Sequence, residues 1–348
     1  MPADKRMLFL RNAESLKDDS VPRRSAEYQV VADARIVGEL PFGPYVFSIW
    51  EISNRREGDG RWLCLRVQER MRDPSSMTAD RFGFYHGGVI PSELVALASL
   101  FLRQRLRLGP IVRMDDSPRL LPEKHGWIDR EIVSGESNFG ELANWLARAE
   151  RLKPDLHEPF VLCAKLYQQA LELIESKPDL AYLNLVSAIE VLASRHDLEK
   201  PTLDEVYPDI AALTGRVQDD ELRSGIEQKI VAKERLIKRK FVEFIVTHTD
   251  ETFWSSGSRP QHGRVEPRQL KELMEKVYDQ RSRTLHSGEP FPPNVFHPPL
   301  LDEEFPIGVE MSVGERKWLP EDLVPSPHFF ERLVNHVLKN FLVRHSTE

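Results

Sequence analysis

The sequence predicts an α+β N-terminal domain, with mixed strands and helices, followed by an all-α helical bundle. Segments rich in β-branched and aromatic residues alternate with turn signals in the first half of the chain, which is typical of strands. After residue 159 the apolar residues recur every three or four positions, which is typical of helices. The polar stretch 153–159 contains two prolines and marks a domain junction. We therefore divide the chain into residues 1–153, of unknown role, and residues 154–348.

The composition describes a soluble globular protein that can bury a substantial core. Of the 348 residues, 41% are hydrophobic and 30% charged, and the net charge of −7 argues against bulk electrostatic binding of nucleic acid while leaving room for a local basic site. The apolar runs 7–10 and 94–102 are too short for a signal peptide and a membrane span, respectively. The two cysteines, Cys64 and Cys163, form no metal-ligand pattern. We expect a cytoplasmic protein with no membrane contact, metal or other cofactor.

The N-terminal half begins with a polar segment, residues 1–25, which we expect to be a loosely ordered arm. Strands are predicted at 28–37, 45–52, 62–67 and 82–90, with shorter extended pieces at 111–114 and 127–133. Two turn-rich stretches separate the first three strands, and the second and third form a hairpin. Helices are predicted at 91–107 and 138–152.

Two short patterns in this half resemble catalytic motifs. His86-Gly87-Gly88 has the form of an esterase oxyanion loop, but the sequence contains no Gly-x-Ser-x-Gly nucleophile elbow, so a tight turn is the better interpretation. The pair Asp115-Asp116 precedes Ser117-Pro118, which favours turn chemistry over a metal or acid–base site. There is no phosphate loop, dinucleotide fingerprint or zincin motif. Nothing in this half identifies a ligand.

The C-terminal half reads as a sequence of helices. We expect them at 160–175, 180–196, 221–248, 267–288 and 328–344. Only four residues separate the first two, so these helices are antiparallel neighbours. Nine prolines between 290 and 327 exclude regular helix from the loop 289–327.

One helix carries an arginine where its apolar pattern calls for a hydrophobic residue. The pattern begins after Pro267 and continues through Leu270, Leu273, Met274, Val277 and Tyr278 to Arg281 and Leu285. Burying a guanidinium costs free energy unless the charge is paired, so we expect Arg281 to have a specific structural or functional role. His286 follows five positions later, and Gly288 is a natural helix end.

The segment Tyr278-Asp279-Gln280-Arg281-Ser282-Arg283-Thr284-Leu285-His286-Ser287-Gly288 resembles the signature of HEPN-domain proteins, an arginine followed after four to six residues by a histidine. The stretch 182–192, which ends Ser187-Ala188-Ile189-Glu190-Val191-Leu192, is similar to an earlier helix of that family with an embedded acid. The resemblance covers about residues 155–345 and is strongest to the abortive-infection (ApeA-like) branch. It implies an HEPN-like bundle and a homodimer in which both motifs line one cleft.

The resemblance implies metal-independent cleavage of cellular RNA, with tRNA as one candidate, in anti-phage defence or a toxin-like setting. His286 would be the acid/base and Arg281 the phosphate clamp, because imidazole titrates near neutral pH and guanidinium matches phosphate oxygens. Glu190 would hold Arg281 in place. Positions five apart on a helix diverge by roughly 140°, so one chain does not readily direct both side chains at one phosphate, whereas two chains could supply the pair.

Further RNA contacts are expected at Arg283 and Ser282 and, from charge, along the basic stretch 229–240. In that stretch the candidates are Lys233, Lys238, Arg239 and Lys240. A solvated helix face is the alternative interpretation of this stretch. For the motif, the alternatives are a buried Arg281–Glu190 ion pair and a non-catalytic HEPN scaffold whose N-terminal domain binds a regulatory ligand or protein.

Overall fold

An antiparallel sheet organises the N-terminal half of the computed structural model. The structure describes residues 5–50, 62–71, 90–120, 137–198, 202–233, 236–255, 260, 262–296, 303–306, 311–313 and 316–347. Five strands pair in the order β3-β4-β5-β1-β6, and every pairing is antiparallel. Their bounds are β1 Arg23–Ala32, β3 Leu40–Phe42, β4 Tyr45–Ile49, β5 Trp62–Arg70 and β6 Leu106–Met114. β2 (Ile36–Val37) pairs separately, and in parallel, with β7 (Ser137–Asn138).

The predicted hairpin is confirmed, since β4 pairs with β5 and Phe47 lies opposite Leu65. The predicted strand 28–37 is instead β1, which begins five residues earlier, followed by a break and the short β2. Asp115 follows β6 in a turn with φ +46, and its carboxylate accepts a hydrogen bond from the Ser25 backbone at 2.7 Å. The turn interpretation of the Asp115-Asp116 pair is therefore confirmed. Residues 82–89, 127–133 and the His86-Gly87-Gly88 pattern lie outside the described residues.

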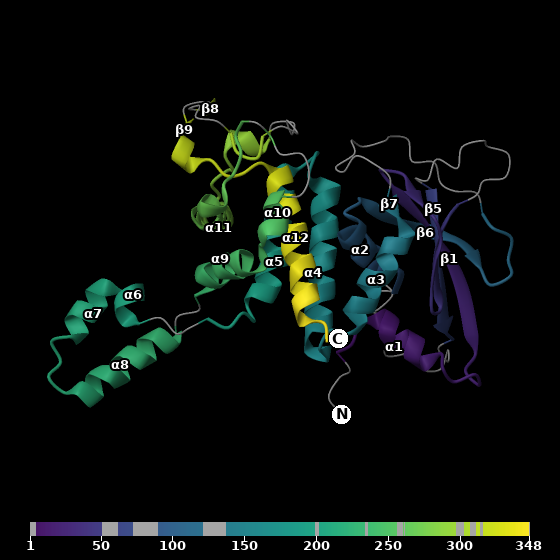
Figure 1. Ribbon diagram of the computed structural model, residues 1–348, viewed down its shortest axis with the longest axis horizontal. Helices are drawn as coiled ribbons and strands as arrows, with labels where there is room; N and C mark the ends of the chain where they lie inside the picture. Colours follow the sequence, from purple (N-terminus) through teal and green to yellow (C-terminus); the bar gives the residue numbers. More distant parts are fainter. Residues whose placement is uncertain are drawn as a thin grey trace.

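Three helices accompany the sheet, and one of them corrects a prediction. α2 (Ile90–Leu102) and α3 (Phe139–Glu150) lie between the sheet and the C-terminal helices (Figure 1). The expected loose arm 1–25 contains a third helix, α1 (Leu8–Ser15), and then the start of β1. Phe9 is fully buried, and its backbone N–H donates to the buried Glu93 carboxylate at 3.0 Å. The polar composition of this segment suggested a loose arm, but burial of the Phe9 ring orders it.

The C-terminal half is rich in helices. They are α4 Pro154–Leu173, α5 Pro178–Ala193, α6 Leu203–Val206, α7 Pro208–Thr214, α8 Asp220–Lys233, α9 Ile237–His248, α10 Glu251–Ser255, α11 Leu270–Ser287 and α12 Pro327–His345. In the described part of the Pro-rich loop the elements are short: η3 Pro293–Val295, β8 Met311–Val313, β9 Arg316–Trp318 and η4 Pro320–Asp322. Because β8 and β9 form a small antiparallel sheet, this half is not strictly all-α.

The predicted domain junction, residues 153–159, falls at the start of α4. Pro154 occupies the first turn of α4, where its missing N–H costs nothing, and Leu156 and Phe160 are buried. One hydrophobic core includes Leu97 of α2, Phe160 of α4 and Leu338 of α12. Its buried polar centre is the Glu331 carboxylate of α12, which accepts hydrogen bonds from Arg103, at 3.0 Å from Nε, and from the Tyr167 hydroxyl. The two halves are therefore held together by packing and by this buried network.

The predicted helix 221–248 is two helices. α8 ends at Lys233 and α9 begins at Ile237, and Leu236 between them has a left-handed conformation with φ +47. A continuous helix cannot contain such a residue. α6, α7 and α8 therefore form a separate projection that extends away from the helix bundle (Figure 1).

Candidate active site at the end of α11

The helix that carries the arginine and histidine has well-defined ends. A 3₁₀ turn, Pro267–Gln269, leads into α11, and the Gln269 side chain accepts a hydrogen bond from the Glu266 backbone N–H at 2.8 Å. Gly288 has φ +67, and its N–H donates to the Thr284 carbonyl at 3.2 Å. A glycine favours this left-handed end because it has no Cβ. The predicted start and stop of this helix are confirmed.

Arg281 and Glu190 meet across α11 and α5. The Arg281 Nη2 lies 2.7 Å from the Glu190 Oε2, and the two side chains are only 19% and 17% exposed. The Nε of Arg281 is buried and has no hydrogen-bond partner among the described residues. The predicted pairing is confirmed, and it leaves this guanidinium with unused capacity to donate. A buried donor without a hydrogen-bond partner is uncommon in a folded protein, and this N–H is available to donate to an acceptor on a ligand.

Tyr278 completes the surroundings of this ion pair. The Arg281 guanidinium carbon lies 5.6 Å from the centre of the Tyr278 ring, which packs against Phe241 of α9. Burial raises the pKa of the Tyr278 hydroxyl, and the nearby Glu190 carboxylate raises it further. The aromatic face and the carboxylate together restrict the guanidinium to one orientation.

His286 lies away from the ion pair. It is exposed in the last turn of α11 and makes no hydrogen bond or ion pair with the residues that the structure describes. Leu285, which we expected to continue the buried face, is 53% exposed. The prediction that Leu285 is buried was wrong. The last turn of α11 extends past the neighbouring helices, so no described residue covers it. The structure thus brings Arg281 to Glu190 and leaves His286 facing outward.

A second group of charges forms where the Pro-rich loop returns to α11. The buried Gln280 donates to the Pro290 carbonyl at 2.9 Å and accepts from the Arg283 Nη2 at 2.9 Å. Glu289 lies 3.9 Å from Arg283 and 2.9 Å from Arg316. Sequence reasoning missed Arg316, since it lies 30 residues beyond His286 and belongs to no motif. Ser282, the other predicted contact in this segment, is partly buried.

The basic stretch 229–240 does not form one charged face. Lys238 forms an ion pair with Asp279 at 2.7 Å, and Lys240 donates to the Ser194 carbonyl at 3.0 Å. Arg239 is exposed in the first turn of α9. Lys233 ends α8, on the far side of the break, and its side chain lies outside the described residues. The predicted RNA-contacting stretch is therefore interrupted by the change of helix and by internal partners.

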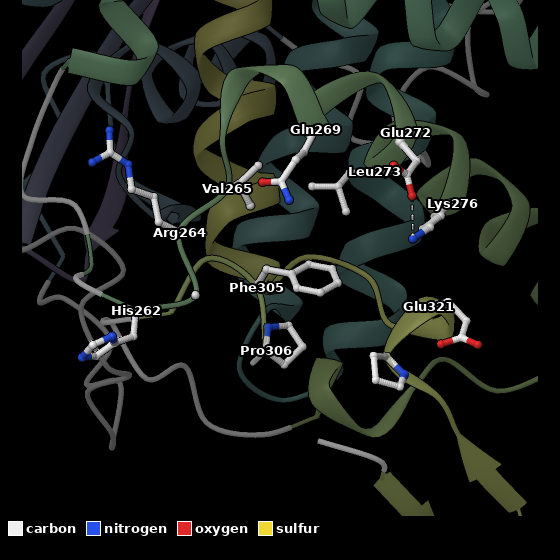
Figure 2. Close-up of a pocket in the computed structure, with 12 residues that line it drawn as sticks. His262, Arg264, Val265, Gln269, Glu272, Leu273, Lys276, Phe305, Pro306 and Glu321 are labelled. Atoms are coloured by element: carbon white, nitrogen blue, oxygen red, sulfur yellow. Dashed lines mark ion pairs between the residues drawn. The ribbon is translucent and has the colours of Figure 1, made fainter. Parts of the chain in front are cut away.

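A separate pocket of about 590 Å³ lies at the other end of α11 (Figure 2). Gln269, Leu273 and Lys276 of the helix region face Phe305 and Pro306 of the Pro-rich loop across it. Its charges are mixed, with Lys276 paired to Glu272 at 3.0 Å. This balance gives the pocket no preference for a charged ligand.

The described residues hold no group of three or more His, Cys, Asp or Glu side chains that could bind a metal ion. Within the same residues, every helix is too short or too polar to cross a membrane.

Comparison with known proteins gives no relative: no family model matches the chain, and neither a curated protein nor a solved structure is detectably similar to it.

Proposed function

We propose that this protein is a metal-independent endoribonuclease of HEPN type that cleaves cellular RNA, with tRNA as one candidate substrate. The observation that carries the proposal is the Arg281 guanidinium, held by Glu190 at 2.7 Å and left with a buried, unpaired Nε. A held guanidinium with spare donors is suited to a phosphate, whose oxygens accept several hydrogen bonds at once. The setting we propose is anti-phage defence or a toxin-like system.

The proposed reaction uses the RNA's own 2′-hydroxyl as the nucleophile. Its oxygen bonds to the adjacent phosphorus, the bond from phosphorus to the 5′-oxygen breaks, and the product ends are a 2′,3′-cyclic phosphate and a 5′-hydroxyl. Arg281 stabilises the extra negative charge on the phosphorane. His286 transfers a proton to or from the reacting oxygens.

We propose that two chains supply one site. On α11 the two residues point roughly 140° apart and are separated by about 7.5 Å along the axis, so the Arg281 of one chain would work with the His286 of the other. The exposed Leu285 supports this proposal, because an apolar side chain beside a catalytic residue is better covered by a second chain than by water.

The alternative function is a non-catalytic scaffold. The observation that favours it is that Glu190 already neutralises Arg281, while His286 has no described partner to orient its ring. In that case the ion pair fixes the packing of α5 against α11, and the sheet half binds a regulatory ligand or protein.

The test is incubation of the purified protein with total RNA and bulk tRNA in EDTA, with the cleaved ends mapped. His286→Ala and Arg281→Ala are the test variants. His262→Ala is the matched control, since His262 is exposed at the opposite end of α11. We expect discrete cuts ending in 2′,3′-cyclic phosphate for the wild type and the control, and none for the test variants. Equal cleavage by all four proteins would refute the assigned roles, and no cleavage by any would favour the scaffold.

A further inference from the structure

Two arginines from distant parts of the sequence meet at the C-terminal end of α11. Arg283 belongs to α11, and Arg316 is the first residue of β9 in the Pro-rich loop. The Nε of Arg283 lies 3.9 Å from the Oε2 of Glu289, and the Nη2 of Arg316 lies 2.9 Å from the same oxygen. One carboxylate therefore holds two guanidinium groups close together.

Each of these guanidinium groups is also fixed by a buried side chain. The Arg283 Nη2 donates to the side-chain oxygen of Gln280 at 2.9 Å, and the fully buried Gln280 donates to the Pro290 carbonyl. The Arg316 guanidinium carbon lies 4.1 Å from the centre of the Trp318 ring, which is 3% exposed. A guanidinium that stacks on an aromatic ring loses little further freedom when it binds a ligand. Both cations are therefore held in place before any ligand arrives.

Both guanidinium groups can still donate to a ligand. The side chains of Arg283 and Arg316 are 44% and 43% exposed. A guanidinium has five N–H donors, and the contacts within the described chain use only some of them. Glu289 and Gln280 accept from Arg283, and Glu289 accepts from Arg316. The remaining donors are available to an acceptor from solution.

The cluster keeps an excess of positive charge after this internal pairing. Within the described chain Glu289 is the one carboxylate that pairs with either arginine, so one positive charge of the three side chains is left over. The C-terminus of a helix carries a negative charge of about half a unit, which is smaller than this excess. The cluster therefore favours an anion. Two guanidinium forks side by side match the several oxygens of a phosphate.

The two-arginine cluster lies on the His286 side of α11. Residues three apart on a helix differ by about 60° in direction, so Arg283 and His286 are neighbours on one face. Arg281, two positions before Arg283, points about 160° away from it. After Gly288 the chain folds back, and the Glu289 backbone N–H donates to the Arg283 carbonyl at 3.4 Å. A phosphate bound here would lie beside the exposed imidazole and apart from the Arg281 ion pair.

We propose that Arg283 and Arg316 bind a backbone phosphate of an RNA strand, next to the phosphate that is cleaved at His286. The inference deepens the proposed function and rests on it, because it names the residues that hold the strand on either side of the reaction. Phosphate contacts of this kind fix the register and direction of a strand without reading its sequence. A strand held at a second phosphate presents its 2′-hydroxyl to His286 in a defined orientation.

The experiment measures binding of the full chain to a short, fluorescently labelled single strand of 2′-O-methyl RNA, by anisotropy at several salt concentrations. This strand keeps its phosphates but lacks the free 2′-hydroxyl, so it cannot be cleaved by the proposed reaction. We expect Arg283→Gln and Arg316→Gln each to weaken binding by about fivefold or more. Each should also reduce the slope of log affinity against log salt by about 0.7, as for one lost phosphate contact on a single strand. Arg268→Gln, exposed just before α11, removes the same charge and should change the affinity less than about twofold.

Glu289→Gln is a second test, and it leaves both arginines in place. The glutamine amide oxygen can still accept from Arg283 and Arg316, while the cluster gains one positive charge. We expect this variant to bind the strand at least about threefold more tightly than the wild type. A purely structural role for the arginines would not produce this gain. Glu272→Gln, exposed in the first turn of α11, is the matched control and should leave the affinity unchanged.

Three results would each overturn the proposal. They are a wild type that does not bind the strand, a loss in Arg316→Gln no larger than that in Arg268→Gln, and a Glu289→Gln variant that binds no more tightly than the wild type. The proposed function is decided separately, by cleavage of natural RNA. A protein that cleaves no RNA but binds as expected would keep the phosphate site and lose only the nuclease assignment, whereas cleavage with unchanged binding in the arginine variants would do the reverse.

Discussion

The coupling between Glu190 and Arg281 is the most informative energy to measure in this protein. Two unit charges about 4 Å apart attract each other by about 4 kcal/mol at an effective dielectric constant of 20. Both side chains are mostly buried, at 17% and 19% exposed, so loss of hydration offsets much of this attraction. We expect a net coupling of about 1–2 kcal/mol.

The assay is a double-mutant cycle with Glu190→Gln, Arg281→Met and the combined variant, followed by urea unfolding. Each single change should lower the free energy of unfolding by about 2–3 kcal/mol, because it leaves one partly buried group without its partner. The double variant should lose about 1–2 kcal/mol less than the sum of the two single losses. A coupling within about 0.3 kcal/mol of zero would refute the claim that Glu190 holds Arg281.

The same variants separate the two candidate functions. If Glu190 positions a catalytic Arg281, Glu190→Gln should reduce cleavage by about 10- to 100-fold, since small misplacements of a phosphate-binding group are costly. Arg281→Met should remove cleavage altogether. Unchanged cleavage in Glu190→Gln, together with a measurable coupling, would assign the pair to packing alone.

Three further outcomes follow from the fold. Glu331→Ala should destabilise the protein by about 3–5 kcal/mol in thermal or urea unfolding, because it leaves Arg103 without its buried partner. Burial lowers the pKa of His248 to about 4, below an unfolded value of about 6.5. The free energy of unfolding therefore keeps the full contribution of neutral His248 above pH 6.5 and loses about 3 kcal/mol as the pH falls toward 4. The variant His248→Asn should not show this loss when the free energy of unfolding is measured against pH. Leu273→Ala should cost about 2–4 kcal/mol, whereas Leu285→Ala at the exposed end of the same helix should cost under about 0.5 kcal/mol in a monomer.

Some features of the chain could be read from local sequence. Strands 45–49 and 62–70 were recognisable because β-branched and aromatic residues with turn signals between them are local properties. α11 was recognisable from its apolar spacing, from Pro267 and from Gly288, which act within one or two helical turns. The Arg281–Glu190 pair was predicted from two signals: a guanidinium in an apolar pattern requires a carboxylate, and the stretch 182–192 resembles a HEPN-family helix with an embedded acid.

Other features depended on contacts between distant segments. The order of α1 comes from burial of Phe9 against the sheet, which its polar neighbours concealed. The break at Leu236 divides a sequence that is helical in composition on both sides, so no local preference revealed it. The position of Arg316 beside Glu289 depends on the path of a Pro-rich loop, which has no periodicity to interpret.

The sequence by itself determined several helices and strands, among them 45–49, 62–70 and α11, and that Arg281 needs a carboxylate. Both follow from spacing and from the cost of burying a charge, which act over short distances. Only the tertiary structure decided that the two halves share one core, that Leu285 and His286 face outward, and that residues 202–233 project as an arm. Those outcomes depend on which surfaces remain uncovered once every other helix has packed, and that is a property of the whole chain.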